Sequence, residues 1–176
     1  MALRITHKAE GFDRAQRAFR ELGDLGADPR ELLEAIGAAL TDSTVERLAV
    51  TNTSPDGVPW PQSRRAQVTG GPTQFDSGMA GLAGSITHNV IPSGVEIGSP
   101  LVYAAQRQEG GTIRARPGKR LVFKTWDSAG NPITIFAKQV TQPARPYLGV
   151  SAEDQIEIEG LALDALEEAL SAGGAR

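Results

Sequence analysis

The segment from residue 52 to residue 76 divides the chain, because turn-forming residues occur in it at nearly every step. It contains the run Asn-Thr-Ser-Pro-Asp-Gly-Val-Pro-Trp-Pro and, further on, Gly-Gly-Pro. This composition disfavours helix and strand, so we expect a long extended loop or arm. Trp60 lies between prolines within it. That side chain either plugs the loop onto the preceding helices or forms an exposed interface anchor.

Two helices are predicted before this loop. Residues 11–24 carry one apolar stripe at helical spacing, made of Phe12, Ala15, Phe19 and Leu22. A second helix is expected over residues 29–51, because Asp28 is a suitable N-cap and Pro29 suits the first helical position. We expect the two helices to pair as a hairpin.

Short strands are predicted after the loop. Weak alternation predicts one antiparallel hairpin over residues 84–97, and a better-marked one joins 121–126 to 133–136 through a turn rich in Asp, Gly and Asn. Between them, residues 101–108 are expected to be helical and to stop at Gly110.

A closing helix is predicted from a capping box at Ser151 to Asp154. Its expected core face consists of Ile156, Leu163, Leu166 and Leu170. The fold class is therefore α+β: a helical hairpin, a mainly antiparallel four-stranded sheet of two hairpins, and a C-terminal helix. We expect a single domain over residues 1–176 with flexible ends at 1–10 and 171–176.

Charge is unevenly distributed along the chain. The net charge of -3 excludes a globally basic protein that wraps nucleic acid. Five basic residues nevertheless lie between Arg107 and Arg120, against the single acid Glu109. From Ser151 onward, seven acidic residues oppose only Arg176. The chain is therefore expected to present a basic and an acidic surface.

The sequence offers no recognisable catalytic constellation. Without Cys there is no disulfide, thiolate nucleophile or Cys zinc site. His7 and His88 have no nucleophile-elbow motif beside them, and the glycine clusters lack the Lys and Ser/Thr of a phosphate loop. No apolar stretch approaches the roughly 20 residues of a membrane span. We expect no enzymatic activity, no cofactor, no metal and no membrane partner.

Four phrases in the same order resemble a known family. They are Leu32-Leu33 through Trp60; Ser77-Gly78 with Gly84-Ser-Ile86; Val95 to Gly98 followed by Val102 to Gly111; and Pro143-Ala-Arg-Pro-Tyr-Leu-Gly149 leading into Ser151. Together these phrases are similar to the phage virion morphogenesis proteins of Mu-like phages, which are related to the tail completion protein S family.

The resemblance implies a structural virion protein at the head-tail junction, acting in neck formation or tail completion after synthesis in the host cytoplasm. Related neck and tail-terminator proteins are ring-forming subunits, typically hexameric. The implied partners are copies of the chain itself, a head-closure or connector protein, and a tail terminator or tail tube protein. DNA would pass through the channel without sequence-specific binding.

Ring closure needs a heterologous interface, in which one surface meets a different surface of the next copy. We expect the basic 107–120 segment of one copy to meet the acidic last helix of its neighbour. Lining a DNA channel is a competing use for that helix. The residues expected near docking surfaces are Trp60, Tyr103, Arg107, Gln108, Arg116, Lys119, Arg120, Arg145, Pro146 and Tyr147.

Two alternatives stay open. Tyr103, Pro146 and Tyr147 would equally suit core packing, because aromatic side chains bury large areas. A function of another class would be a small DNA-binding or regulatory module that uses Arg64, Arg65 and the basic 107–120 segment to neutralise phosphates.

Overall fold

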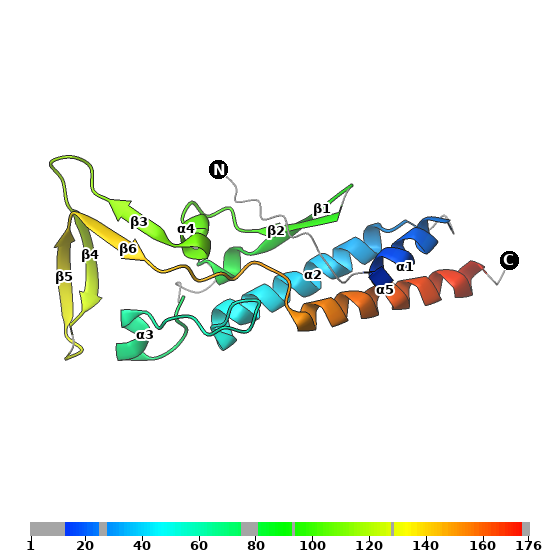
Figure 1. Cartoon of the computed structure of the whole chain (residues 1–176), viewed down its shortest axis with the longest axis horizontal. Helices are drawn as coiled ribbons and strands as arrows, with labels where there is room; N and C mark the ends of the chain where they lie inside the picture. Colours follow the sequence, from blue (N-terminus) through cyan, green and yellow to red (C-terminus); the bar gives the residue numbers. More distant parts are fainter. Residues whose placement is uncertain (1–12, 25–27, 75–80, 93, 128, 174–176) are drawn as a thin grey trace.

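The computed structural model describes residues 13–24, 28–74, 81–92, 94–127 and 129–173, and it shows an elongated α+β molecule (Figure 1). Three helices lie together at one end: α1 (Asp13–Asp24), α2 (Arg30–Glu46) and α5 (Ala152–Gly173). One pair of strands, β1 (Thr87–Ile91) and β2 (Gly94–Gly98), packs against α2, and the other paired strands extend to the opposite end. The expected α+β class with a C-terminal helix is confirmed. The expected flexible ends at 1–10 and 174–176 lie outside the described residues, whereas residues 171–173 continue α5.

The helical end is built around α5. The helices α1 and α2 follow each other in the chain, but each makes most of its interhelical contacts with α5, so the expected two-helix hairpin is in fact a three-helix arrangement. Small and aliphatic side chains fill the space between them: Ala15, Ala18, Leu22, Leu32, Ile36, Leu40, Ile158 and Ala162. The alanines let the helices approach closely.

The predicted core face of α5 was right for Leu166, which packs against the core, and wrong for its other three members. Ile158 and Ala162 are buried, whereas Ile156, Leu163 and Leu170 are 74%, 43% and 53% exposed. The reason is that α5 carries two apolar stripes, and the one containing alanine fits the close approach of α1 and α2. The larger aliphatic stripe is left on the outside.

The segment 52–74 is more regular than its composition suggests. It follows a π-helical turn η1 (Arg47–Thr51), contains an isolated bridge between Thr53 and Pro59, and includes the helix α3 (Arg64–Thr69). The hydroxyl of Ser63 caps α3 by accepting the backbone N–H of Ala66. The expected extended arm is therefore corrected for its described part: it is folded back onto the molecule.

The strands form three separate two-stranded antiparallel ribbons, not one four-stranded sheet. The two predicted hairpins are present as β1–β2 (Thr87–Ile91, Gly94–Gly98) and β4–β5 (Leu121–Trp126, Pro132–Ala137). The third ribbon, β3–β6 (Gly111–Arg114, Gln139–Gln142), was not predicted. Its two strands flank the segment that contains β4–β5 and pair where that segment begins and ends. They are about 25 residues apart in the sequence. The predicted short helix is α4 (Ala104–Glu109), which ends at Gly110 with φ +69.

A buried ion pair joins the end of α2 to the start of α5. The Nη1 of Arg47 donates to Oδ2 of Asp154 at 2.9 Å, and its Nη2 donates to the carbonyl of Gly149. The predicted capping box is confirmed: Asp154 accepts the N–H of Ser151, and Ser151 Oγ accepts the N–H of Asp154. Burial raises the pKa of Asp154, but the hydrogen bonds from Ser151, Ser43 and Arg47 outweigh it and leave the pKa below 3.8.

Replacing Asp154 by Ala is expected to lower the free energy of unfolding by about 3–5 kcal/mol, because Arg47 is left as a buried unpaired charge. The double variant Arg47→Met/Asp154→Leu should cost less than that single change. Since the folded-state pKa of Asp154 is lowered, its contribution is complete above pH 3.8 and is lost as the pH falls through the folded-state value. Urea unfolding at several pH values measures both effects, and equal losses in the two variants would contradict the prediction.

His88 in β1 packs over Gly37 in α2. Its Nδ1 bonds with Thr41 Oγ1 at 3.1 Å and its Nε2 with Glu34 Oε2 at 3.3 Å. Both ring nitrogens therefore have partners, and the ring ties β1 to α2. A Cβ on Gly37 would lie only 2.4 Å from His88 Cδ2.

Gly37→Ala is therefore expected to destabilise the fold by about 1–3 kcal/mol, through overpacking. Gly160→Ala is the matched control, because nothing lies within 4 Å of a Cβ at that position in α5. The control should stabilise the protein by about 1 kcal/mol through helix propensity. Thermal unfolding of the two variants compares them directly, and a stabilised Gly37→Ala protein would contradict the packing.

Candidate assembly interface

The two distinctive phrases of the sequence, residues 98–111 and 143–149, lie against each other. Gln108 at the end of α4 holds the second phrase through its side-chain amide. Its Oε1 accepts the backbone N–H groups of Tyr147 (2.9 Å) and Leu148 (3.0 Å), and its Nε2 donates to the carbonyl of Leu148. The Gln108 side chain thus makes the hydrogen bonds to residues 147 and 148 that a neighbouring strand would otherwise make.

The 52–74 segment completes this contact through Trp60 and Pro61. Trp60 Nε1 donates to the carbonyl of Pro146 at 3.0 Å, while Nε and Nη2 of Arg145 both donate to the carbonyl of Pro61. Trp60 belongs to a second apolar core whose buried members are Leu48, Trp60, Leu82, Ile86, Ala104, Tyr147 and Leu148. Of the two readings of Trp60, the structure therefore supports the plug, although onto this second core and not onto the helical end.

Four of the ten expected docking residues are thus buried within the chain: Trp60, Gln108, Arg145 and Tyr147. Their side chains hold the molecule together and offer no surface to a partner. Core packing is the correct reading for Tyr147, whose side chain is fully enclosed. Whether these residues lie beside a docking surface is not tested by a single chain, and that part of the expectation stays a prediction.

Three further docking residues lie around the same contact. Pro146 is exposed, Tyr103 is 37% exposed, and Arg107 is half-buried with its carbonyl accepting the N–H of Arg145. Burial raises the pKa of the Tyr147 hydroxyl to about 12, with a further contribution from Tyr103. The Tyr147 hydroxyl donates to the carbonyl of Ala104 at 3.3 Å.

The raised pKa predicts a loss of stability at alkaline pH. In the unfolded chain Tyr147 ionises near its ordinary value of 10.0, so its contribution is complete below that value and declines as the pH rises towards 12. Unfolding free energies between pH 9 and pH 12 should therefore fall more steeply in the parent protein than in Tyr147→Phe. That variant should itself lose about 1 kcal/mol at neutral pH with its hydrogen bond. Parallel pH profiles would contradict the prediction.

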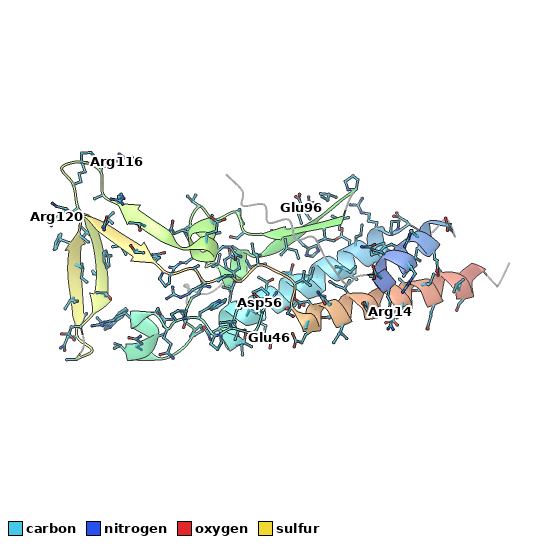
Figure 2. All side chains as sticks on the ribbon, in the orientation of Figure 1. Arg14, Glu46, Asp56, Glu96, Arg116 and Arg120 are labelled. Carbon is cyan, nitrogen blue, oxygen red and sulfur yellow. The ribbon has the colours of Figure 1, made fainter. Side chains whose placement is uncertain are left out.

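The remaining docking residues, Arg116, Lys119 and Arg120, form an exposed basic tip. A tight turn shapes it, since the N–H of Lys119 donates to the carbonyl of Arg116 at 2.9 Å and Gly118 has φ +74. The tip surrounds a hollow of about 410 Å³, lined by Ala115, Arg116, Pro117, Gly118, Lys119, Arg120 and Lys138. Figure 2 places Arg116 and Arg120 at the ribbon end of the molecule, away from the helices.

The helix α5, which carries the acidic residues, runs from the middle of the molecule to the end opposite the tip (Figure 1). Apart from the buried Asp154 and the half-buried Glu159, these acidic residues are exposed: Glu153, Glu157, Asp164, Glu167 and Glu168. Because tip and helix lie far apart within one chain, they do not neutralise each other. Opposite charges at opposite ends suit contact between two copies.

Arg64 and Arg65, the other candidates for phosphate contact, are engaged within the chain. Arg64 Nε donates to the carbonyl of Trp126, and Arg65 donates to the carbonyls of Gly70 and Pro72. They fasten α3 to β4 and to its own following loop. The basic tip is therefore the better candidate for any contact with an anionic partner.

Within the described ranges, no group of three or more His, Asp or Glu side chains could hold a metal ion, and no helix is long and apolar enough to cross a membrane. His88 is engaged in structural contacts, and His7 lies outside the described residues. The described side chains thus present charged and apolar surfaces as the features that a partner would recognise.

A family model described as the phage virion morphogenesis family matches residues 11–167. The chain belongs to this family. The match covers α1, α2, the interlocked phrases, the basic tip and α5 as far as residue 167. No curated protein and no solved structure matches the chain.

Proposed function

We propose that this virion morphogenesis protein is a structural component of the head-tail junction, where it assembles as a ring that joins the head-closure side to the tail. The observation that carries the proposal is the separation of charge: a basic tip at one end of an elongated subunit and an acidic helix at the other. Such subunits associate through unlike ends, with the basic tip of one copy on the acidic helix of the next. Contacts of this kind close into a ring when the rotation between neighbours permits.

The arrangement of the buried residues supports an architectural role. The residues that are most distinctive in the sequence hold the 143–149 segment between α4 and Trp60. The expected partners remain part of the proposal: copies of the chain in a hexamer, a head-closure or connector protein, and a tail terminator or tail tube protein.

The interface is tested by charge reversal at both ends. One variant, Arg116→Glu/Lys119→Glu/Arg120→Glu, reverses the tip, and the other, Asp164→Lys/Glu167→Lys/Glu168→Lys, reverses the helix. All six side chains are exposed, so each substitution should change the free energy of unfolding by no more than about 0.5 kcal/mol. In each variant alone, the tip of one subunit and the helix of the next would carry the same charge. Neither variant should therefore join phage heads to phage tails.

A mixture of the two variants should restore joining, because each contact then pairs opposite charges in an alternating ring. The readout is the yield of complete particles from host cells in which the phage copy of the gene is inactivated and the variants are supplied separately or together. Electron microscopy should show unjoined heads and tails for either variant alone. Normal particles without the protein would refute the proposed function. Failure of the mixture to restore particles would refute the contact between the basic tip of one subunit and the acidic helix of the next.

Binding to duplex DNA separates this proposal from the DNA-binding alternative. A module that uses the tip to neutralise phosphates would bind DNA with a steep dependence on salt, and the tip variant would abolish that binding. A ring subunit whose tip contacts protein should bind DNA weakly at moderate salt. Tight duplex binding that the tip variant removes would favour the alternative.

A further inference from the structure

The exposed face of α5 carries an apolar stripe that nothing in the described chain covers. Ile156, Leu163 and Leu170 are spaced by seven residues, so each is offset from the last by only about 20° around the helix. They form a stripe about 21 Å long. Glu159 and Glu167 lie four residues before and after Leu163 and border the stripe on its two sides.

The β4–β5 ribbon carries a second uncovered apolar surface. Val122 and Phe136 are directly opposite each other in the strand register, and each is 61% exposed. The next pair on the same face, Lys124 and Thr134, is also exposed. A two-stranded ribbon is marginally stable in water without a packing partner. In the described chain α3 packs against β4, and the face of Val122 and Phe136 is left exposed.

The two surfaces are complementary in charge. The ribbon face presents the apolar pair Val122–Phe136 between Lys124 and the basic tip. The α5 stripe is apolar and is bordered by glutamates. Figure 1 shows β4–β5 at one end of the molecule and α5 running from the middle to the opposite end, so the two surfaces do not meet within one chain.

Pairing of like surfaces is less favourable. Two α5 stripes facing each other would bring rows of glutamates together, and two ribbon faces would oppose Lys124 to its copy. Like charges brought together at an interface cost several kcal/mol. The charge pattern therefore selects the ribbon of one copy and the helix of another.

We propose that the ribbon face around Val122 and Phe136 docks on the Ile156–Leu163–Leu170 stripe of a second copy of this chain. The inference rests on the proposed ring, and it names the surfaces that meet in it. The basic tip lies next to the docked ribbon, so its charges face the acidic side of α5. Apolar contact supplies the affinity, and the charges set the orientation.

Disulfide trapping tests the contact directly, because the chain contains no Cys. Phe136→Cys and Leu163→Cys are prepared as separate proteins with tags of different mass, mixed in equal amounts, oxidised and separated without reductant. A disulfide forms only when the two Cα atoms approach within about 7 Å. We expect a mixed dimer of one Phe136→Cys chain and one Leu163→Cys chain.

Val102→Cys is the matched control. Val102 is 98% exposed and lies before α4, outside both surfaces. Its mixed dimer with Leu163→Cys should form at least about tenfold less than the Phe136 pair, since a thiol outside the contact lacks the raised effective concentration. Equal yields from both pairs would overturn the inference.

Three other outcomes would also overturn it. Predominant Phe136→Cys homodimers would show ribbon-to-ribbon contact, and predominant Leu163→Cys homodimers would show helix-to-helix contact. A Leu163→Cys thiol that a maleimide does not label in the isolated chain would show that the chain covers its own stripe.

The result is separable from the proposed function. If the mixed dimer forms but particles join heads to tails without the protein, the contact stands and the proposed function falls. If charge swapping restores particles but the mixed dimer does not form, the proposed function stands and this inference falls.

Discussion

The hydrogen bonds that hold residues 145–149 are the constraint on which the two ends of the molecule depend. This segment belongs to no strand, and Arg145, Tyr147 and Leu148 within it are buried. Gln108 accepts two of its N–H groups, Gln74 donates to the carbonyl of Arg145, and Trp60 donates to the carbonyl of Pro146. Buried backbone groups left without partners are costly, so these three side chains determine the path by which β6 leads into α5.

The path has a consequence for charge. The helix α5 begins directly after the locked segment. The Arg47–Asp154 pair fixes its start against α2, and the helix then runs away from the β3–β6 and β4–β5 ribbons. The acidic side chains are thereby carried to the end opposite the basic tip. The separation of charge that supports an assembly role is thus a product of the folded core.

Local signals in the sequence predicted the individual elements well. The cap at Ser151, the stop at Gly110 and the turn around Asp127 each act within a few residues, and the structure has all three. Asp127 even accepts the N–H groups of Ala129 and Asn131 within its own turn, and its hydrogen bonds with Asn131 lower its pKa.

Long-range choices were not readable from the same sequence. The pairing of Ile113 with Val140 leaves no local trace, so the β3–β6 ribbon was missed. Two apolar stripes compete on α5, and only the packing of α1 and α2 decides that Ala162 faces inward and Leu163 outward. Trp60 and Gln108 looked like anchors for a partner because nothing in their neighbourhood announces the buried carbonyls and N–H groups that they satisfy.

The β3–β6 stem gives the molecule an adjustable reach. The chain enters residues 115–138 from β3 and leaves them through β6, so this pair of strands connects the β4–β5 ribbon to the rest of the molecule. Lengthening both strands by two residues would move the outer ribbon by about 7 Å and keep every side chain on its original face. In the proposed ring, a longer or shorter stem would change the spacing between neighbouring subunits, and hence the ring diameter, while the helices stay as they are.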